Sequence, residues 1–171
     1  MSTARSLLPL AALTAAAAVL AGCETVPMGP VAPAGPAAFR ADDFAWSSTS
    51  GRAAIEGRVD YRRDGQVFSC TGSVALTPDT PYTRARFRTL YGSTDRAALP
   101  EAVVRARTVA DPNADYRSFV RSETCRNGTF DFVGLPAGGW FIIAPVSAGG
   151  DRVVLMRHVE TRNGRIAVTL P

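Results

Sequence analysis

Few side chains of this 171-residue sequence have a type and spacing that could carry out catalysis. Hydrolysis needs a nucleophile, a base and a stabilising group that converge, and the chain has a single histidine, His158. It lies in the alternating run VVLMRHVET, in which the apolar residues Val153, Leu155 and Val159 point to the opposite face of a strand. We therefore expect His158 on an exposed strand surface. An enzyme would require a carboxylate beside His158 in a pocket. G-x-S-x-G, H-E-x-x-H and glycine-rich phosphate loops are absent from the sequence, which predicts no enzymatic activity and no cofactor.

Three arginines in the segment TPYTRARFRTLYG, residues 80–92, could bind anions. If this segment is an extended strand, Arg84, Arg86 and Arg88 share one face and Phe87 lies on the other. Such a row could engage lipid phosphates, teichoic-type polymers or an acidic polysaccharide. The alternative is a charged edge strand that prevents aggregation.

The cysteines divide into one near the N-terminus and two in the body of the chain. Cys70 and Cys125 form an even pair, which in an oxidising compartment predicts a disulfide; two buried free thiols are the alternative. The chain has no C-x-x-C motif for redox chemistry. Two cysteines and one distant histidine do not form a zinc site either, so no metal is expected.

Cys23 follows Leu20-Ala21-Gly22, a tripeptide that resembles the bacterial lipobox. Arg5 and the apolar residues 7–20 precede it, and this run is too short to span roughly 30 Å of hydrocarbon as a helix. We therefore expect residues 1–22 to be a lipoprotein signal peptide and Cys23 to carry the lipid. A plain secretory signal with an incidental cysteine is the alternative. Glu24 is not the aspartate that favours retention in the inner membrane, so the outer membrane is favoured.

Residues 23–38 are expected to form a lipidated N-terminus followed by a tether. The stretch TVPMGPVAPAGPAA has four prolines, two glycines and no charge, a composition typical of a semi-rigid polyproline spacer. The remaining residues 39–171 are long enough for one domain with a core. The net charge of the full chain is +4, and its basic residues are all arginine. This small excess does not indicate a nucleic-acid partner.

The domain sequence predicts an all-β fold, an antiparallel β-sandwich of about seven strands. Short alternating segments are separated by turn pairs such as Asp64-Gly65 and Asn127-Gly128. Residues 116–125 are expected to form a strand, and the apolar run 140–146 a central strand buried on both faces. The only helix expected is a short turn at residues 99–103.

Three segments resemble the carboxypeptidase regulatory-like domain, which has a transthyretin-like fold. They are AIEGRV, SVALTP and GTFDFVGLPAGGWFI, within residues 52–148. The resemblance implies a sandwich without an active site of its own. Where this family usually has a Thr-Asp pair before its turn glycine, this chain instead has Thr124-Cys125-Arg126-Asn127-Gly128. A cysteine at this place, together with Cys70 on an earlier strand, suggests a disulfide-linked subgroup.

The sequence therefore predicts a lipid-anchored, non-catalytic protein of the cell envelope, on the periplasmic side of the membrane. Its expected partners are the membrane, through the lipid, and an envelope protein or polysaccharide. A binding or scaffold module is favoured, and a glycan- or peptidoglycan-binding lipoprotein is the alternative. Phe44 and Trp46 are expected to cap the sandwich rather than to form a carbohydrate platform.

Overall fold

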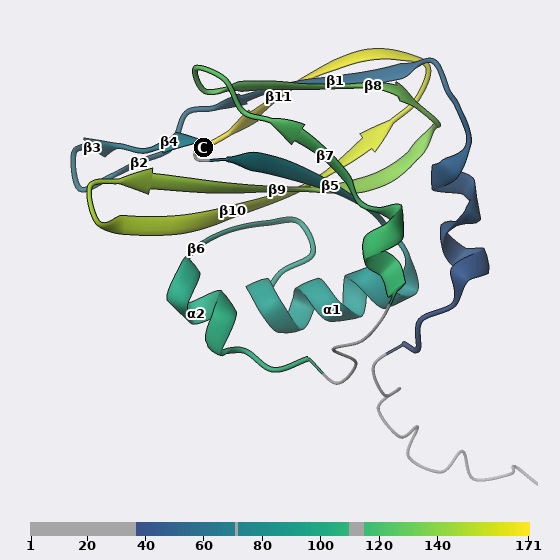
Figure 1. Cartoon of the computed structure of the whole chain (residues 1–171), viewed down its shortest axis with the longest axis horizontal. Coiled ribbons are helices and arrows are strands. Elements are labelled where there is room, and N and C mark those ends of the chain that lie inside the picture. Colours follow the sequence, from purple (N-terminus) through teal and green to yellow (C-terminus); the bar gives the residue numbers. More distant parts are fainter. Residues whose placement is uncertain (1–36, 71, 110–114) are drawn as a thin grey trace, which may run out of the picture. The chain divides into compact units, whose positions relative to one another are not determined.

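The alternating segments of the sequence form two β-sheets that pack face to face (Figure 1). The computed structural model describes residues 37–70, 72–109 and 115–171. The smaller sheet has the strand order β11-β1-β8, and the larger has the order β6-β10-β9-β5-β7, with β4 paired to the end of β9. The strands β2 and β3 form a separate hairpin. The prediction of an all-β sandwich is confirmed.

The described residues form eleven strands, three 2-residue strands included. Their bounds are β1 Ala53–Val59, β2 Arg62–Arg63, β3 Gln66–Val67, β4 Ser69–Cys70, β5 Ser73–Pro78, β6 Arg96–Pro100, β7 Arg121–Thr124, β8 Thr129–Leu135, β9 Gly138–Ala148, β10 Asp151–Thr161 and β11 Gly164–Leu170. The two α-helices are α1 Pro81–Tyr91 and α2 Glu101–Ala106, and the 3₁₀ helices are η1 Ala41–Ser48 and η2 Asp115–Phe119. One pairing departs from the antiparallel expectation, because β1 and β11 run parallel.

The core lies between the two sheets and follows the period-two pattern of the strands. In β1, Ala53, Ile55 and Gly57 are buried while Glu56 and Arg58 are exposed, as the alternation predicts. Gly57 has a specific role here, because a Cβ at this position would lie 2.0 Å from the aromatic ring of Phe130 on β8. A larger residue there would displace this ring from the core.

The expected turns and central strand are confirmed. Asp64 and Gly65 have φ of 51° and 78°, and Asn127 and Gly128 have φ of 52° and 79°, the left-handed conformations that tight hairpin turns require. The apolar run 140–146 lies inside β9, which pairs with β10 on one side and β5 on the other. Its continuous apolar character follows from burial on both faces.

The second face of the larger sheet is covered by α1, whereas the predicted arginine row required this segment to be an extended strand. Thr80 begins the helix with a capping box to Thr83, Pro81 follows it, and Gly92 ends the helix in a left-handed conformation at φ 73°. Phe87 and Tyr91 pack against the sheet in a second hydrophobic cluster. The helical period that buries these residues is hidden in the sequence by the alternation of the arginines.

Of two smaller elements, the strand expected at 116–125 differs from the structure, and the helical turn expected at 99–103 agrees with it in part. Residues 115–119 form the 3₁₀ helix η2, so the predicted strand 116–125 is wrong in its first half and begins only at Arg121. The helical turn expected at 99–103 overlaps α2, which begins at Glu101 and ends at Ala106, while residues 99 and 100 belong to β6. No helix within the described residues is long and apolar enough to cross a membrane.

The aromatic residues before β1 cap one end of the domain, as expected. Phe44 is fully buried and clusters with Tyr82, and Phe39 and Phe119 pack against them. Trp46 meets Trp140 edge-on, with 5.0 Å between ring centroids. These contacts leave Phe44 and Trp46 in structural roles.

Candidate functional site

The three arginines predicted to form an anion-binding row are separated by the helix. An α-helix turns about 100° per residue, so Arg84 and Arg88 lie on one side and Arg86 on another. Arg84 forms an ion pair with Asp79, and the Arg86 guanidinium lies 4.9 Å from the centroid of the Tyr116 ring. Arg88 is exposed. The single-faced row was a wrong prediction, because the segment that carries it is not extended.

Asp79 also contacts His158, which the sequence analysis wrongly expected on an exposed strand surface. The His158 Nε2 atom lies 2.7 Å from Asp79 Oδ2, and the two side chains are only 16% and 7% exposed. The Phe141 ring packs on the imidazole at 5.0 Å. A Cβ on Gly139 would lie 2.8 Å from Asp79 Oδ2, so glycine provides the space that this contact needs.

The Asp79–His158 pair satisfies one of the two conditions that an enzyme would need, a carboxylate beside the histidine. The second condition, a pocket, is not met within the described cavities, because neither residue lines one. The His158 Nε2 atom is engaged by the carboxylate, and the other carboxylate oxygen, Oδ1, is buried without a hydrogen-bond partner among the described residues. The pair connects β10 to the segment between β5 and α1. No group of three or more His, Cys, Asp or Glu side chains within this part of the chain could hold a metal.

A groove of about 440 Å³ lies between α1 and η2, over the outer face of the larger sheet. We call it the α1 groove. It is lined by Ala75, Thr77, Phe87, Leu90, Tyr91, Tyr116, Arg117, Val120, Ser122 and Ile143. Its volume is within the range of about 300–1,000 Å³ that is usual for ligand sites.

The α1 groove combines aromatic surface with a few polar groups. Tyr116 is half-buried, and Arg117 and Ser122 are exposed. Tyr91 is more deeply set, and burial raises the pKa of its hydroxyl to about 12, with a further increase from the nearby Tyr116. The Tyr91 hydroxyl therefore remains a neutral hydrogen-bonding group at any physiological pH. No acidic residue lines the groove within the described part of the chain.

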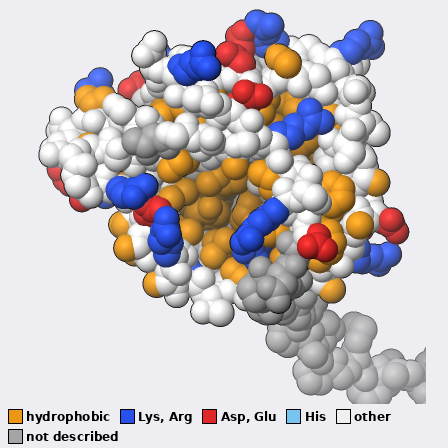
Figure 2. Space-filling view, in the orientation of Figure 1, with side chains coloured by type: hydrophobic (Ala, Val, Ile, Leu, Met, Phe, Trp, Pro, Cys, Tyr) orange, Lys and Arg blue, Asp and Glu red, His pale blue; other side chains and the backbone are white. Residues whose placement is uncertain are grey.

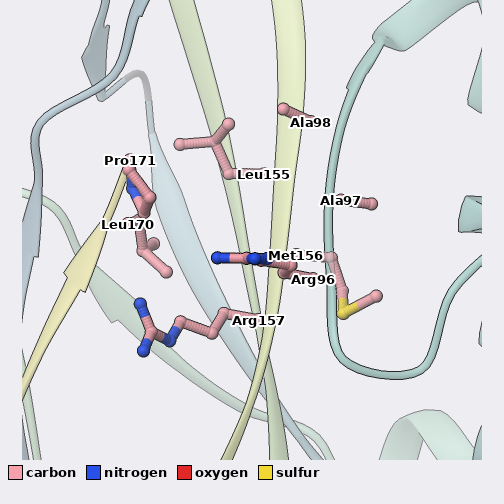
Figure 3. A pocket seen from close by; sticks show the side chains of 8 residues that line it. All are labelled: Arg96, Ala97, Ala98, Leu155, Met156, Arg157, Leu170 and Pro171. Carbon is pink, nitrogen blue, oxygen red and sulfur yellow. The ribbon is translucent and has the colours of Figure 1, made fainter.

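A second cavity of about 290 Å³ opens where β6, the edge strand of the larger sheet, faces the end of β11 (Figure 3). We call it the edge cleft. It is lined by Arg96, Ala97, Ala98, Leu155, Met156, Arg157, Leu170 and Pro171.

Figure 2 shows a face of the molecule on which hydrophobic side chains gather in a hollow with arginines around it. Sequence patterns did not indicate either cavity, since each is assembled from elements far apart in the chain.

The predicted disulfide is confirmed, with Cys70 of β4 bonded to Cys125, the residue after β7. The two Cα atoms are 5.9 Å apart and 55 residues apart in sequence. Cys23, the signal peptide and most of the predicted tether lie outside the described residues.

One comparison with solved structures finds a similar fold. The crystal structure of a "putative carbohydrate binding protein (PA1324)" from Pseudomonas aeruginosa aligns with a TM-score of 0.57 and 23% sequence identity, over 77% of this chain and 96% of that chain. No family model matches the sequence, and no curated protein matches it. The similarity defines the class of the protein as a β-sandwich domain of the same architecture. Membership of the carboxypeptidase regulatory-like family stays a prediction.

Proposed function

We propose that this chain is a non-catalytic carbohydrate-binding protein of the bacterial envelope, and that the α1 groove holds the sugar. The observation that carries the proposal is the composition of the groove. Its polar lining consists of two tyrosines, one threonine, one serine and one arginine around a single hollow. Sugars present hydroxyl groups that both donate and accept hydrogen bonds, and C–H faces that pack on aromatic rings. A scaffold surface would not need such a hollow.

The charges around the groove favour an acidic glycan. Arg117 lines it, and Arg86 lies over Tyr116 at its border. With no carboxylate among the described lining residues, a uronate would meet guanidinium groups without a competing negative charge. The fold similarity to a protein named for carbohydrate binding supports the same class of ligand. Export and lipid attachment at Cys23 are part of the proposal and rest on the sequence motif.

The test is calorimetric titration of the full chain with hexagalacturonate, and with maltohexaose as an uncharged oligosaccharide of equal length. We expect saturable binding of the acidic sugar. Tyr116→Ala should weaken the binding of hexagalacturonate about tenfold or more, because an aromatic contact surface is lost. Arg117→Gln should also weaken the binding of hexagalacturonate, but it should leave any affinity for maltohexaose unchanged. Arg162→Gln, an exposed arginine on the β10–β11 turn, is the matched control.

Two results would overturn the proposal. One is the absence of saturable binding to either oligosaccharide and to a broader set of envelope glycans. The other is binding that Tyr116→Ala and Arg117→Gln leave at the affinity of the control variant. Either would favour the scaffold function, in which the bound partner is another envelope protein.

A further inference from the structure

We infer that the edge cleft is a second binding site, for an alkyl carboxylate of medium chain length. The inference is independent of the ligand of the α1 groove. It starts from an unfavourable pairing in the larger sheet, where Arg96 of β6 stands directly opposite Arg157 of β10. Like charges directly opposite each other on neighbouring strands are destabilising. Figure 3 shows both side chains extending from their strands toward Leu170 and Pro171, into the same space.

The partners of these arginines within the protein neutralise little of their charge. The Arg157 Nη1 atom donates a hydrogen bond of 2.7 Å to the carbonyl oxygen of Thr169, a neutral acceptor. Among the described carboxylate side chains, Arg96 pairs with Asp95 alone, at 3.9 Å, and these two side chains are 75% and 83% exposed. No carboxylate side chain lines the cleft within the described residues. An anion placed between two guanidinium groups would therefore turn a repulsive pair into a two-sided, charge-assisted site.

The rest of the cleft is apolar and reaches the core of the sandwich. Leu155 and Leu170 line it and are only 2% and 1% exposed. Apart from the two arginines, every side chain that lines it in the described structure is that of alanine, leucine, methionine or proline. A cavity that has a paired cationic mouth and an apolar interior matches an amphipathic anion, with its head between the arginines and its chain against the leucines.

This composition separates an alkyl carboxylate from a sugar acid. A uronate has the same charged group, but its hydroxyls need hydrogen-bonding partners when they leave water. The lining residues offer no hydroxyl or amide side chain for them. The edge cleft and the α1 groove therefore have different chemistries, since hydroxyl side chains line only the groove.

The test is calorimetric titration of the full chain with octanoate. Two comparison compounds separate the contributions of charge and alkyl chain: 1-octanol has the alkyl chain without the charge, and acetate has the carboxylate without the long alkyl chain. We expect saturable octanoate binding, with each comparison compound at least about tenfold weaker. Arg96→Gln should weaken octanoate binding about tenfold, the effect of one charge-assisted hydrogen bond. The exposed Arg126 on the β7–β8 turn supplies the control variant, Arg126→Gln.

A second variant keeps the test independent of charge. Ala98 lies opposite Leu155 in the sheet register and lines the cleft from the exposed edge strand. Ala98→Trp should fill the cavity and abolish octanoate binding while the thermal midpoint of unfolding stays close to that of the parent. The inference is overturned if octanoate does not saturate, if acetate binds as tightly as octanoate, or if Arg96→Gln and Ala98→Trp both retain the parent affinity.

Discussion

Tyr91 connects the interior of the domain with the α1 groove. It packs edge-on against Phe87 on the covered face of the larger sheet, it is 9% exposed, and it lines the groove. Burial opposes the charged phenolate and raises the pKa of Tyr91 to about 12. The same side chain thus stabilises the helix–sheet contact and offers a neutral hydroxyl near the proposed ligand.

This raised pKa predicts a loss of stability at alkaline pH. An unfolded tyrosine ionises near pH 10, whereas folded Tyr91 keeps its proton until about pH 12. Between these values the unfolded state binds fewer protons than the folded state, so the free energy of unfolding must fall as the pH rises, by about 3 kcal/mol at most. Urea unfolding at a series of pH values measures this slope. Tyr91→Phe should flatten it, and a variant with the parent slope would contradict the assignment to Tyr91.

At the scale of elements, Asp79 joins three parts of the fold. It follows β5, precedes α1, and binds both Arg84 of α1 and His158 of β10. Its backbone N–H also donates a hydrogen bond of 2.9 Å to the carbonyl oxygen of Gly139 in β9. The first turn of the helix is therefore held in place by polar contacts to two strands of the sheet it covers.

Replacement of Asp79 should consequently destabilise the protein more than replacement of an exposed aspartate. Asp79→Asn removes the buried charge that Arg84 and His158 contact, and we expect the free energy of unfolding to fall by about 1–3 kcal/mol. Urea unfolding with an unchanged m-value measures the loss. The matched control is Asp64→Asn, on a turn where the side chain is 92% exposed and where asparagine also tolerates positive φ. Equal effects of the two substitutions would contradict this role of Asp79.

The elements that local sequence patterns predict are those whose signal lies within a few residues. The Asp64-Gly65 and Asn127-Gly128 turns require left-handed conformations that these residue types adopt, and the apolar run 140–146 identifies the central strand. The segment 81–91 has two periods at once, a charged one of two residues at the arginines and a buried one of four residues at Thr83, Phe87 and Tyr91. The capping box at Thr80, with Pro81 after it and Gly92 at the far end, favours the helical one, and packing against the sheet stabilises it.

The candidate sites were less predictable because their parts are distant in sequence. His158 and Asp79 are 79 residues apart, and the histidine looks like a surface residue until its partner is known. The disulfide was predictable because only two cysteines remained after the lipobox cysteine. The arginines of the edge cleft carried no signal, since neither lies in a distinctive motif and only strand pairing brings them together.

At the scale of the whole domain, the larger sheet is the central layer. It contributes Trp140 and Leu155 to the core between the sheets, and Phe141 and Met156 to the cluster beneath α1. Each proposed site uses one of its faces: the α1 groove lies on the helix side, and the edge cleft opens on the side of β11. Ligands at the two sites would therefore be separated by the sheet and could bind together.

Lipid attachment at Cys23, which the lipobox-like sequence predicts, would anchor the chain to a membrane. Each buried methylene of an acyl chain contributes about 0.8 kcal/mol, so several chains give stable anchoring. Cys23→Ala should therefore move the protein from the membrane fraction to the soluble fraction of expressing cells, and the intact mass should lack the acyl groups. The control is the Cys70→Ser, Cys125→Ser double variant, which should stay with the membrane because it keeps Cys23. A Cys23→Ala protein that remained in the membrane fraction would contradict lipid anchoring through this cysteine.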